Sequence, residues 1–248
     1  MTFSTNAPPH CHSFDQMLII NADDLGRDAA TTDAILSCYA KRRITSTSAM
    51  VFMADSERAA GLALTSGIEV GLHINLSEQF SGSSLPTRLG EHHRRICRFL
   101  KASKYALLVY HPGLRDAFRY VFEAQHAEFV RLYNREPSHF DGHQHMHLAT
   151  NMLLQHLMPA GARVRRSFSF RAGEKSLINR AYRSAVDRCL ARRHRITDYF
   201  FSLAQHFAPD SLKRIVEMAK CASVELMTHP ARADEYAYLM DKGIPAER

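Results

Sequence analysis

Short runs of apolar and β-branched residues recur along the chain, each bounded by polar or turn-forming residues. Runs of roughly four to eight such residues are typical of β-strands. The predicted strands cover 17–20, 45–52, 68–76, 138–147, 162–166, 198–204 and 223–230, and 162–166 carries the weakest pattern. Within 138–147, Asp141, His143 and His145 alternate, so a strand there would turn their side chains to one face.

Between these runs, apolar residues recur at spacings of three and four, which is the pattern of amphipathic helices. The predicted helices cover 28–40, 56–64, 114–134, 149–158, 176–194 and 209–220. Ser56 is a plausible N-cap, and Asn134 a plausible left-handed C-terminal cap. Residues 77–90 predict a long loop, 91–104 predict a basic helix or loop, and 231–248 show no clear element.

Strands that alternate with helices in this way predict a parallel sheet covered by helices. Periodicity alone allows an open doubly wound sheet or a closed barrel. The barrel is favoured because unusual polar residues follow four different strands, and barrel enzymes carry their chemistry at the C-terminal ends of strands. We therefore predict one TIM-barrel-like (β/α) domain over 17–248 with about seven parallel strands, after a flexible tail at 1–16.

Composition narrows the function classes. The chain has 15 histidines in 248 residues and a net charge of +7, which favours an anionic ligand or a membrane surface. No nucleic-acid-binding motif is visible, so we expect no nucleic-acid partner. The five cysteines are scattered and form no CxxC pair, the segment 1–16 lacks the pattern of a signal peptide, and no apolar run approaches the length that spans a bilayer. These features predict a cytoplasmic protein.

The polar residues at the predicted strand ends suggest a catalytic metal centre. They are Asp23, Asp24, His73, Asp141, His143, His145 and His229. One carboxylate and two imidazoles leave coordination positions open for water and substrate, a second carboxylate can act as general base, and another histidine can protonate a leaving group. Together these groups predict metal-assisted hydrolysis.

Each piece also has a simpler interpretation. Asp23 and Asp24 could be carboxylates at a helix N-terminus, His73 and His229 could be hydrogen-bonded core histidines, and the histidine-rich segment could be a surface turn. We interpret the remaining scattered histidines as surface residues: His10, His12, His92, His93, His126 and His206.

Five motifs in unbroken order resemble the YdjC-like carbohydrate deacetylase family, which includes chitooligosaccharide deacetylases and a hopanoid-biosynthesis branch. They are Asn-Ala-Asp-Asp-Leu-Gly at 21–26, Thr-Ser-Thr-Ser at 45–48, Gly-Leu-His-Ile-Asn-Leu at 71–76, the segment 135–147, and Met-Thr-His-Pro at 227–230. The resemblance implies a distorted (β/α) barrel that uses Mg²⁺ or Zn²⁺ to remove N-acetyl groups from sugars.

Carried over by position, the resemblance implies Asp24, His73 and His143 as metal ligands. It implies Asp23 as the general base that activates a metal-bound water, and His229 as the general acid. The residues that would support these groups or contact substrate are Asn21, Asp141, His145 and His147.

Two alternatives stay open: a metal-dependent hydrolase of another sugar ester or phosphoester, and a non-catalytic sugar- or membrane-binding protein. The expected partner is an N-acetylated sugar, as an oligosaccharide or a glycolipid. The basic segment 176–195 could contact a glycolipid or membrane surface. The chain continues only briefly after the last motif, so a second copy could complete the barrel in a homodimer.

Overall fold

The computed structural model describes residues 18–170, 174 and 176–244, so the predicted tail at 1–16 lies outside the described residues. Its centre is a six-stranded parallel sheet in the order β4-β3-β2-β1-β6-β5. The strands are β1 (Leu18–Leu25), β2 (Ser46–Ala49), β3 (Glu69–Ile74), β4 (Phe140–Gly142), β5 (Tyr199–Ser202) and β6 (Val224–Thr228). The sheet curls into a half-barrel, which confirms a single α/β domain of the predicted class.

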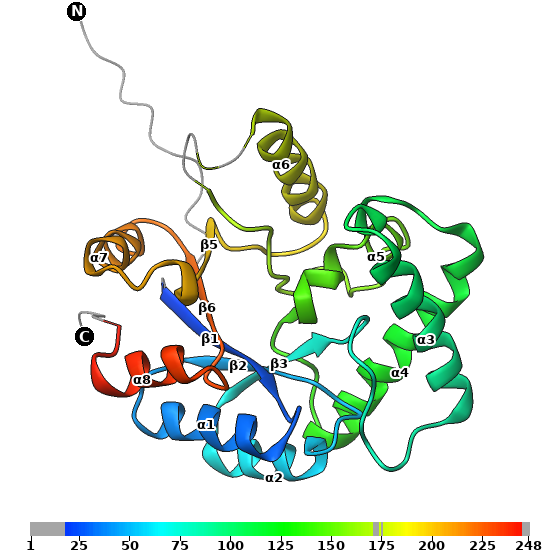
Figure 1. The fold of residues 1–248 in the computed structure, drawn as a ribbon, viewed down its shortest axis with the longest axis horizontal. Helices are drawn as coiled ribbons and strands as arrows, with labels where there is room; N and C mark the ends of the chain where they lie inside the picture. The colour runs from blue at the N-terminus through cyan, green and yellow to red at the C-terminus, as the bar shows by residue number, and fades with distance from the viewer. Residues whose placement is uncertain (1–17, 171–173, 175, 245–248) are drawn as a thin grey trace, which may run out of the picture.

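Helices surround the outside of this curled sheet (Figure 1). They are α1 (Ala29–Ala40), α2 (Ser56–Ser66), α3 (Thr87–Ala102), α4 (Arg115–Tyr133), α5 (Thr150–Leu154), α6 (Leu177–Ala191), α7 (Pro209–Met218) and α8 (Ala233–Asp241). Asn134 ends α4 with φ of 50°, as its left-handed preference predicts. Over the described ranges, no helix is both long and apolar enough to cross a membrane.

The two faces of the sheet differ in chemistry. The outer face carries apolar residues such as Ile20, Leu72 and Leu226, which are buried in the hydrophobic core against the helices. The register pairs Asn21 with Ser46 and His73 with Asp141, so these polar residues share the inner face. The fold therefore holds a polar cluster inside the half-barrel, near the C-terminal ends of the strands.

Two predicted strands differ from the structure. Segment 162–166 forms only isolated bridges, Phe140 with Val164 and Arg163 with Arg195, so six strands form the sheet where about seven were expected. These bridges connect the β4 edge with the residues before β5, which narrows the open side of the half-barrel.

The predicted histidine strand also ends early. β4 stops at Gly142, and a 3₁₀ turn over His143–Leu148 follows, in which Gln144 and His145 have φ of 53° and 59°. The turn folds back so closely that a Cβ at Gly142 would lie 2.8 Å from the backbone nitrogen of His147. The expectation that Asp141, His143 and His145 share one strand face is therefore wrong.

The predicted helix boundaries differ less from the structure than the predicted strands do. Asp55, rather than the expected Ser56, occupies the N-cap position of α2, although the Ser56 hydroxyl accepts a hydrogen bond from the Met53 N–H at 2.9 Å. The predicted helix 149–158 shortens to α5, and α8 forms in a segment where no element was expected.

Candidate metal centre and catalytic site

The end of β1 delivers two consecutive carboxylates to one place. Neighbouring residues of a regular strand face opposite sides, but the β1–β2 register shifts between Ala22 and Leu25, as at a β-bulge. Asp24 also has φ of 76°, a left-handed conformation that a non-glycine residue rarely adopts. Local strain of this kind is concentrated at functional sites, and here it lets both Asp23 and Asp24 reach the inner cluster.

Asp24, His73 and His143 form a compact donor set. The Asp24 Oδ1 lies 3.2 Å from Nε2 of His73 and 2.9 Å from Nδ1 of His143. Their ligand atoms all lie within 4.8 Å of one another, close enough to share one ion. Asp24 and His73 are buried, and only a small part of the His143 side chain is exposed. The structure thus brings together the three residues that the resemblance implied.

The other nitrogen of each imidazole is held by a carboxylate. Asp141 Oδ1 lies 2.8 Å from Nδ1 of His73, and Glu78 Oε2 lies 3.0 Å from Nε2 of His143. Metal-ligating histidines usually have such a partner, which fixes the tautomer and the ring orientation. The donor set and its support therefore fit a divalent transition metal.

Asp23, His73 and Asp141 make a second group that satisfies the same distance criterion. The guanidinium of Arg165, however, already neutralises both of its carboxylates, and a cation at hydrogen-bond distance opposes a metal ion in the same place. The first group is the better metal site.

Arg165 is a buried cation at the centre of the inner face. Its two terminal nitrogens each lie 2.7 Å from an oxygen of Asp23, and one of them lies 2.8 Å from Asp141. Its Nε donates to Glu225 at 2.7 Å, and its guanidinium lies over the Phe200 ring. One arginine therefore ties together carboxylates from β1, β4 and β6.

This network sets the charge of the site. Burial alone would raise the pKa of Asp23, but Arg165 and His73 outweigh burial and hold that pKa below its ordinary value. Burial likewise opposes ionisation of Asp24, yet hydrogen bonds from His143 and His73 hold its pKa well below the usual range. Burial would lower the pKa of His73, but Asp141 and Asp23 raise it to about 10. The buried carboxylates and imidazoles of the site therefore stabilise one another's charged forms.

His229 directly follows β6 and lies near Asp23. Its Nε2 lies 4.0 Å from Asp23 Oδ2, and its side chain is 28% exposed. Buried Glu235 of α8 accepts a hydrogen bond from the His229 backbone N–H at 2.8 Å, and its second oxygen lies 3.6 Å from the ring Nδ1. Burial lowers the pKa of His229, but Glu235 and Asp23 raise it overall above its ordinary value. His229 thus has surroundings that favour its protonated form, and its side chain remains partly open to solvent.

The remaining predicted site residues lie around this centre. The Asn21 side-chain amide donates to Asp23 at 2.9 Å and to Ser48 at 2.7 Å. His147 Nε2 donates to the backbone carbonyl of Arg165 at 3.0 Å. His145 lies outside both candidate metal groups and packs edge-on against Phe168, with ring centroids 4.5 Å apart.

Comparison with known proteins identifies the family of this chain. The model of the family described as YdjC-like protein matches residues 17–246, nearly the whole chain. The chain belongs to the YdjC family.

Several relatives of this YdjC-family chain are named as deacetylases. A chitooligosaccharide deacetylase of Enterobacter sp. (strain 638) is 28% identical over 89% of this chain and 83% of its own length. One of Serratia marcescens is 30% identical over 54% of this chain, and the match spans about half of that relative. A carbohydrate deacetylase of Mus musculus is 34% identical over 53% of this chain and 43% of its own length.

One solved structure has the same fold. It is the crystal structure of a protein from Enterococcus faecalis V583 whose proposed role is cellobiose-phosphate cleavage. It superposes with a TM-score of 0.59 and 20% sequence identity, over 89% of this chain and 83% of that one.

Sequence reasoning missed several residues of this YdjC-family site. Arg165 lies in the weakest predicted strand, where a run of arginines usually indicates exposure. Glu78 lies in the predicted loop, Glu225 within a predicted apolar strand, and Glu235 in a segment with no predicted element. His93 was expected at the surface but is buried and stacks on Phe80, with ring centroids 4.0 Å apart.

Proposed function

We propose that this chain is a metal-dependent carbohydrate N-deacetylase that removes N-acetyl groups from an acetylated amino sugar. The main observation behind the proposal is the Asp24–His73–His143 donor set beside a further carboxylate, Asp23, and a further imidazole, His229. Membership of the YdjC family and the names of its relatives support a carbohydrate deacetylase. Mg²⁺ and Zn²⁺ are the proposed ions.

In this proposal, Asp24, His73 and His143 hold the ion, and Asp141 and Glu78 orient the two imidazoles. A divalent ion there would polarise the acetamide carbonyl and make a nearby water more acidic. The remaining steps belong to side chains of the protein.

Asp23 would act as the general base. Its lowered pKa means that it is ionised at neutral pH and ready to accept a proton from the attacking water. Arg165 and Asn21 hold both of its oxygens in place, which limits the orientations that the carboxylate can adopt. Positioning of this kind is a large part of what an enzyme contributes to such a proton transfer.

His229 would act as the general acid. The rise in its pKa favours the protonated ring, from which Nε2 can donate a proton to the departing amine. Glu235 stabilises that charged form from the opposite side of the ring. Asp23 would therefore be the base and His229 the acid, with Oδ2 of Asp23 and Nε2 of His229 4.0 Å apart.

Acetate release tests the proposal directly. The protein would be supplied with Mg²⁺, Zn²⁺, Co²⁺ or Ni²⁺ and offered N-acetylated oligosaccharides, N-acetylated glycolipids, and ester and phosphoester analogues. We expect acetate from the acetamides, and much slower release by the Asp23→Asn variant. Hydrolysis of esters or phosphoesters alone would favour the other hydrolase. Absence of any turnover would favour a sugar- or membrane-binding protein. The pairing of Asp23 with His229 argues against that alternative, because a protein that only binds has no need of a base and an acid.

We make three further proposals, on membrane contact, on a homodimer and on cellular location. The N-terminal end of α6 exposes Leu177 at 79% and Ile178 at 83%, next to basic residues, which supports membrane-surface or glycolipid contact through 176–195. Vesicle co-sedimentation tests that contact, and sedimentation equilibrium tests the proposed homodimer. The proposed cytoplasmic location agrees with the free thiols of Cys38, Cys97 and Cys189, and cell fractionation would test it.

A further inference from the structure

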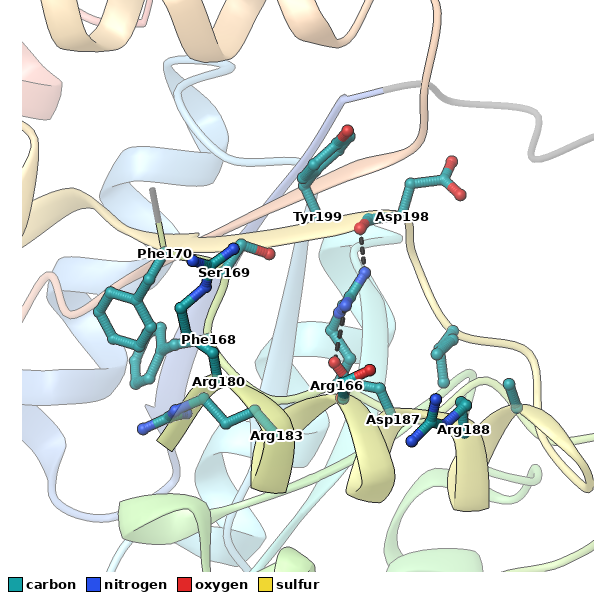
Figure 2. Close-up of a pocket in the computed structure, with 13 residues that line it drawn as sticks. Arg166, Phe168, Ser169, Phe170, Arg180, Arg183, Asp187, Arg188, Asp198 and Tyr199 are labelled. Carbon is teal, nitrogen blue, oxygen red and sulfur yellow. Dashed lines mark hydrogen bonds and ion pairs between the residues drawn. The ribbon is translucent and has the colours of Figure 1, made fainter. Parts of the chain in front are cut away.

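A cavity of about 410 Å³ lies between α6 and β5, beside the segment that follows Arg165. Its volume falls within the range of small-ligand pockets. Guanidinium groups and aromatic rings dominate its lining: Arg180, Arg183, Arg188, Phe168, Phe170 and Tyr199. Figure 2 shows Arg180 and Arg183 on the side bordered by Phe168 and Phe170, and Arg188 on the side of Arg166.

The spacing of the arginines along α6 brings several of them to this cavity. Positions 180, 183 and 187 are separated by three and four residues, which places Arg180 and Arg183 on the same face of α6 as the buried residue Asp187, and Arg188 follows Asp187 at the edge of that face. That face packs towards β5 and the segment 166–170, whereas Arg193 follows the helix and lies outside the lining.

The carboxylates at the cavity already have partners. Asp187 accepts hydrogen bonds from Arg166 at 2.6 Å and from the Ser167 hydroxyl at 2.9 Å. Asp198 accepts from the backbone N–H and the hydroxyl of Ser223, at 2.8 and 2.7 Å. Of the four arginines that line the cavity among the described residues, only Arg166 is therefore matched by a described carboxylate.

The three arginines of α6 have no such match. In the part of the chain that the structure describes, no carboxylate pairs with Arg180, Arg183 or Arg188. Arg183 donates only to the Asn179 side chain at 2.8 Å, and its guanidinium lies 4.9 Å from the centre of the Phe170 ring. Burial lowers the pKa of Arg183, and the nearby charge of Asp187 does not fully offset that effect.

We propose that the cavity between α6 and β5 binds a phosphate group of an organic ligand. Guanidinium groups donate paired, charge-assisted hydrogen bonds that match the oxygens of phosphate. The aromatic rings beside them can pack against the organic part of the ligand. None of the lining residues that the structure describes belongs to the metal and acid–base machinery, so this site is separate from the proposed deacetylation. Phe168, which also contacts His145, connects the cavity wall with the region of that centre.

Binding measurements with three probes test the site. Inorganic phosphate and N-acetylglucosamine 6-phosphate would be titrated calorimetrically, and phosphatidylcholine vesicles with and without phosphatidylglycerol would be used for co-sedimentation. We expect binding of at least one phosphate-bearing probe, and the probe that binds most tightly identifies a free anion, a sugar phosphate or a lipid headgroup as the source. Binding should weaken as the salt concentration rises.

The matched variants are the double substitution Arg180→Gln with Arg188→Gln and, as control, Arg193→Gln. Both substituted pocket residues are exposed, so the protein should fold normally. The double variant should bind the probe about tenfold more weakly or worse, because each lost guanidinium removes charged hydrogen bonds. The control should bind as the unaltered protein does. If no probe binds, or if the control weakens binding as much as the double variant, the proposal is wrong. Acetate release from a neutral acetylated sugar should be unchanged in all three proteins.

Discussion

Replacing Arg165 with methionine should destabilise the protein strongly. The substitution keeps an unbranched side chain but removes the cation that contacts Asp23, Asp141 and Glu225 at 2.7 to 2.8 Å. The Arg165 side chain is 0% exposed, so water cannot replace it without rearrangement. Removing one partner of a buried ion pair costs about 3–5 kcal/mol. For a chain of this size, that cost corresponds to a fall in melting temperature of about 6–20 °C.

The effect should depend on pH in a defined direction. In the unaltered protein the pKa values of Asp23 and Asp141 are lowered, so their contribution to stability is present above the pKa of the unfolded chain and is lost on acidification. Without Arg165, burial raises these pKa values, and the variant loses stability as pH rises. The difference between the two proteins should therefore be largest near neutral pH and shrink towards about pH 4.

Differential scanning calorimetry from pH 4 to pH 8 measures this difference. Arg163→Met is the matched control, because Arg163 lies two residues away and pairs with Glu69 in a partly exposed ion pair. That control should change the free energy of unfolding by about 1 kcal/mol or less. An Arg165→Met protein as stable as the control, or equally destabilised at every pH, would contradict the assigned role of the arginine.

The remaining predictions concern the reaction. Asp24→Ala should abolish metal binding in calorimetry, whereas His145→Ala should leave it intact; equal losses would remove Asp24 from the ligand set. Asp23→Asn should retain the metal while kcat falls about 10²–10⁴-fold, and unchanged turnover would refute the general base. Glu235→Gln should lower the pKa of His229. Since a general acid loses activity as pH rises through its pKa, the alkaline limb of the kcat/KM profile should move to lower pH; a shift of the acidic limb instead would indicate that His229 acts as a base.

The strand–helix order could be predicted because it depends on local patterns. The runs at the cores of β1, β3 and β6 are buried, and buried parallel strands read as apolar sequence. The turn after Gly142 could not be predicted this way, since its shape depends on left-handed φ values at Gln144 and His145. Alternation of polar residues looks the same in a strand and in an irregular turn.

Some residues of the candidate site could be predicted from the sequence, and others could not. The places of polar residues at strand ends indicated the site as a whole, the resemblance singled out Asp24, His73 and His143 as its ligands, and the structure brings these three together. Arg165 could not be predicted, because a buried arginine is identified by the carboxylates around it, and these come from strands far apart in the sequence. Glu235 was missed because its helix shows too little apolar periodicity to be recognised without the contact to His229.

The central claim is that acetate release needs one metal ion per chain. Adding measured amounts of metal back to the metal-free protein tests it most directly. The protein would be stripped with a chelator and titrated with Zn²⁺ or Mg²⁺ while acetate release from an N-acetylated oligosaccharide is followed, with His143→Ala titrated in parallel. The account predicts no acetate without metal, recovery that saturates at one ion per chain, and no recovery in the variant. Full acetate release from the metal-free protein, or equal recovery in His143→Ala, would contradict it.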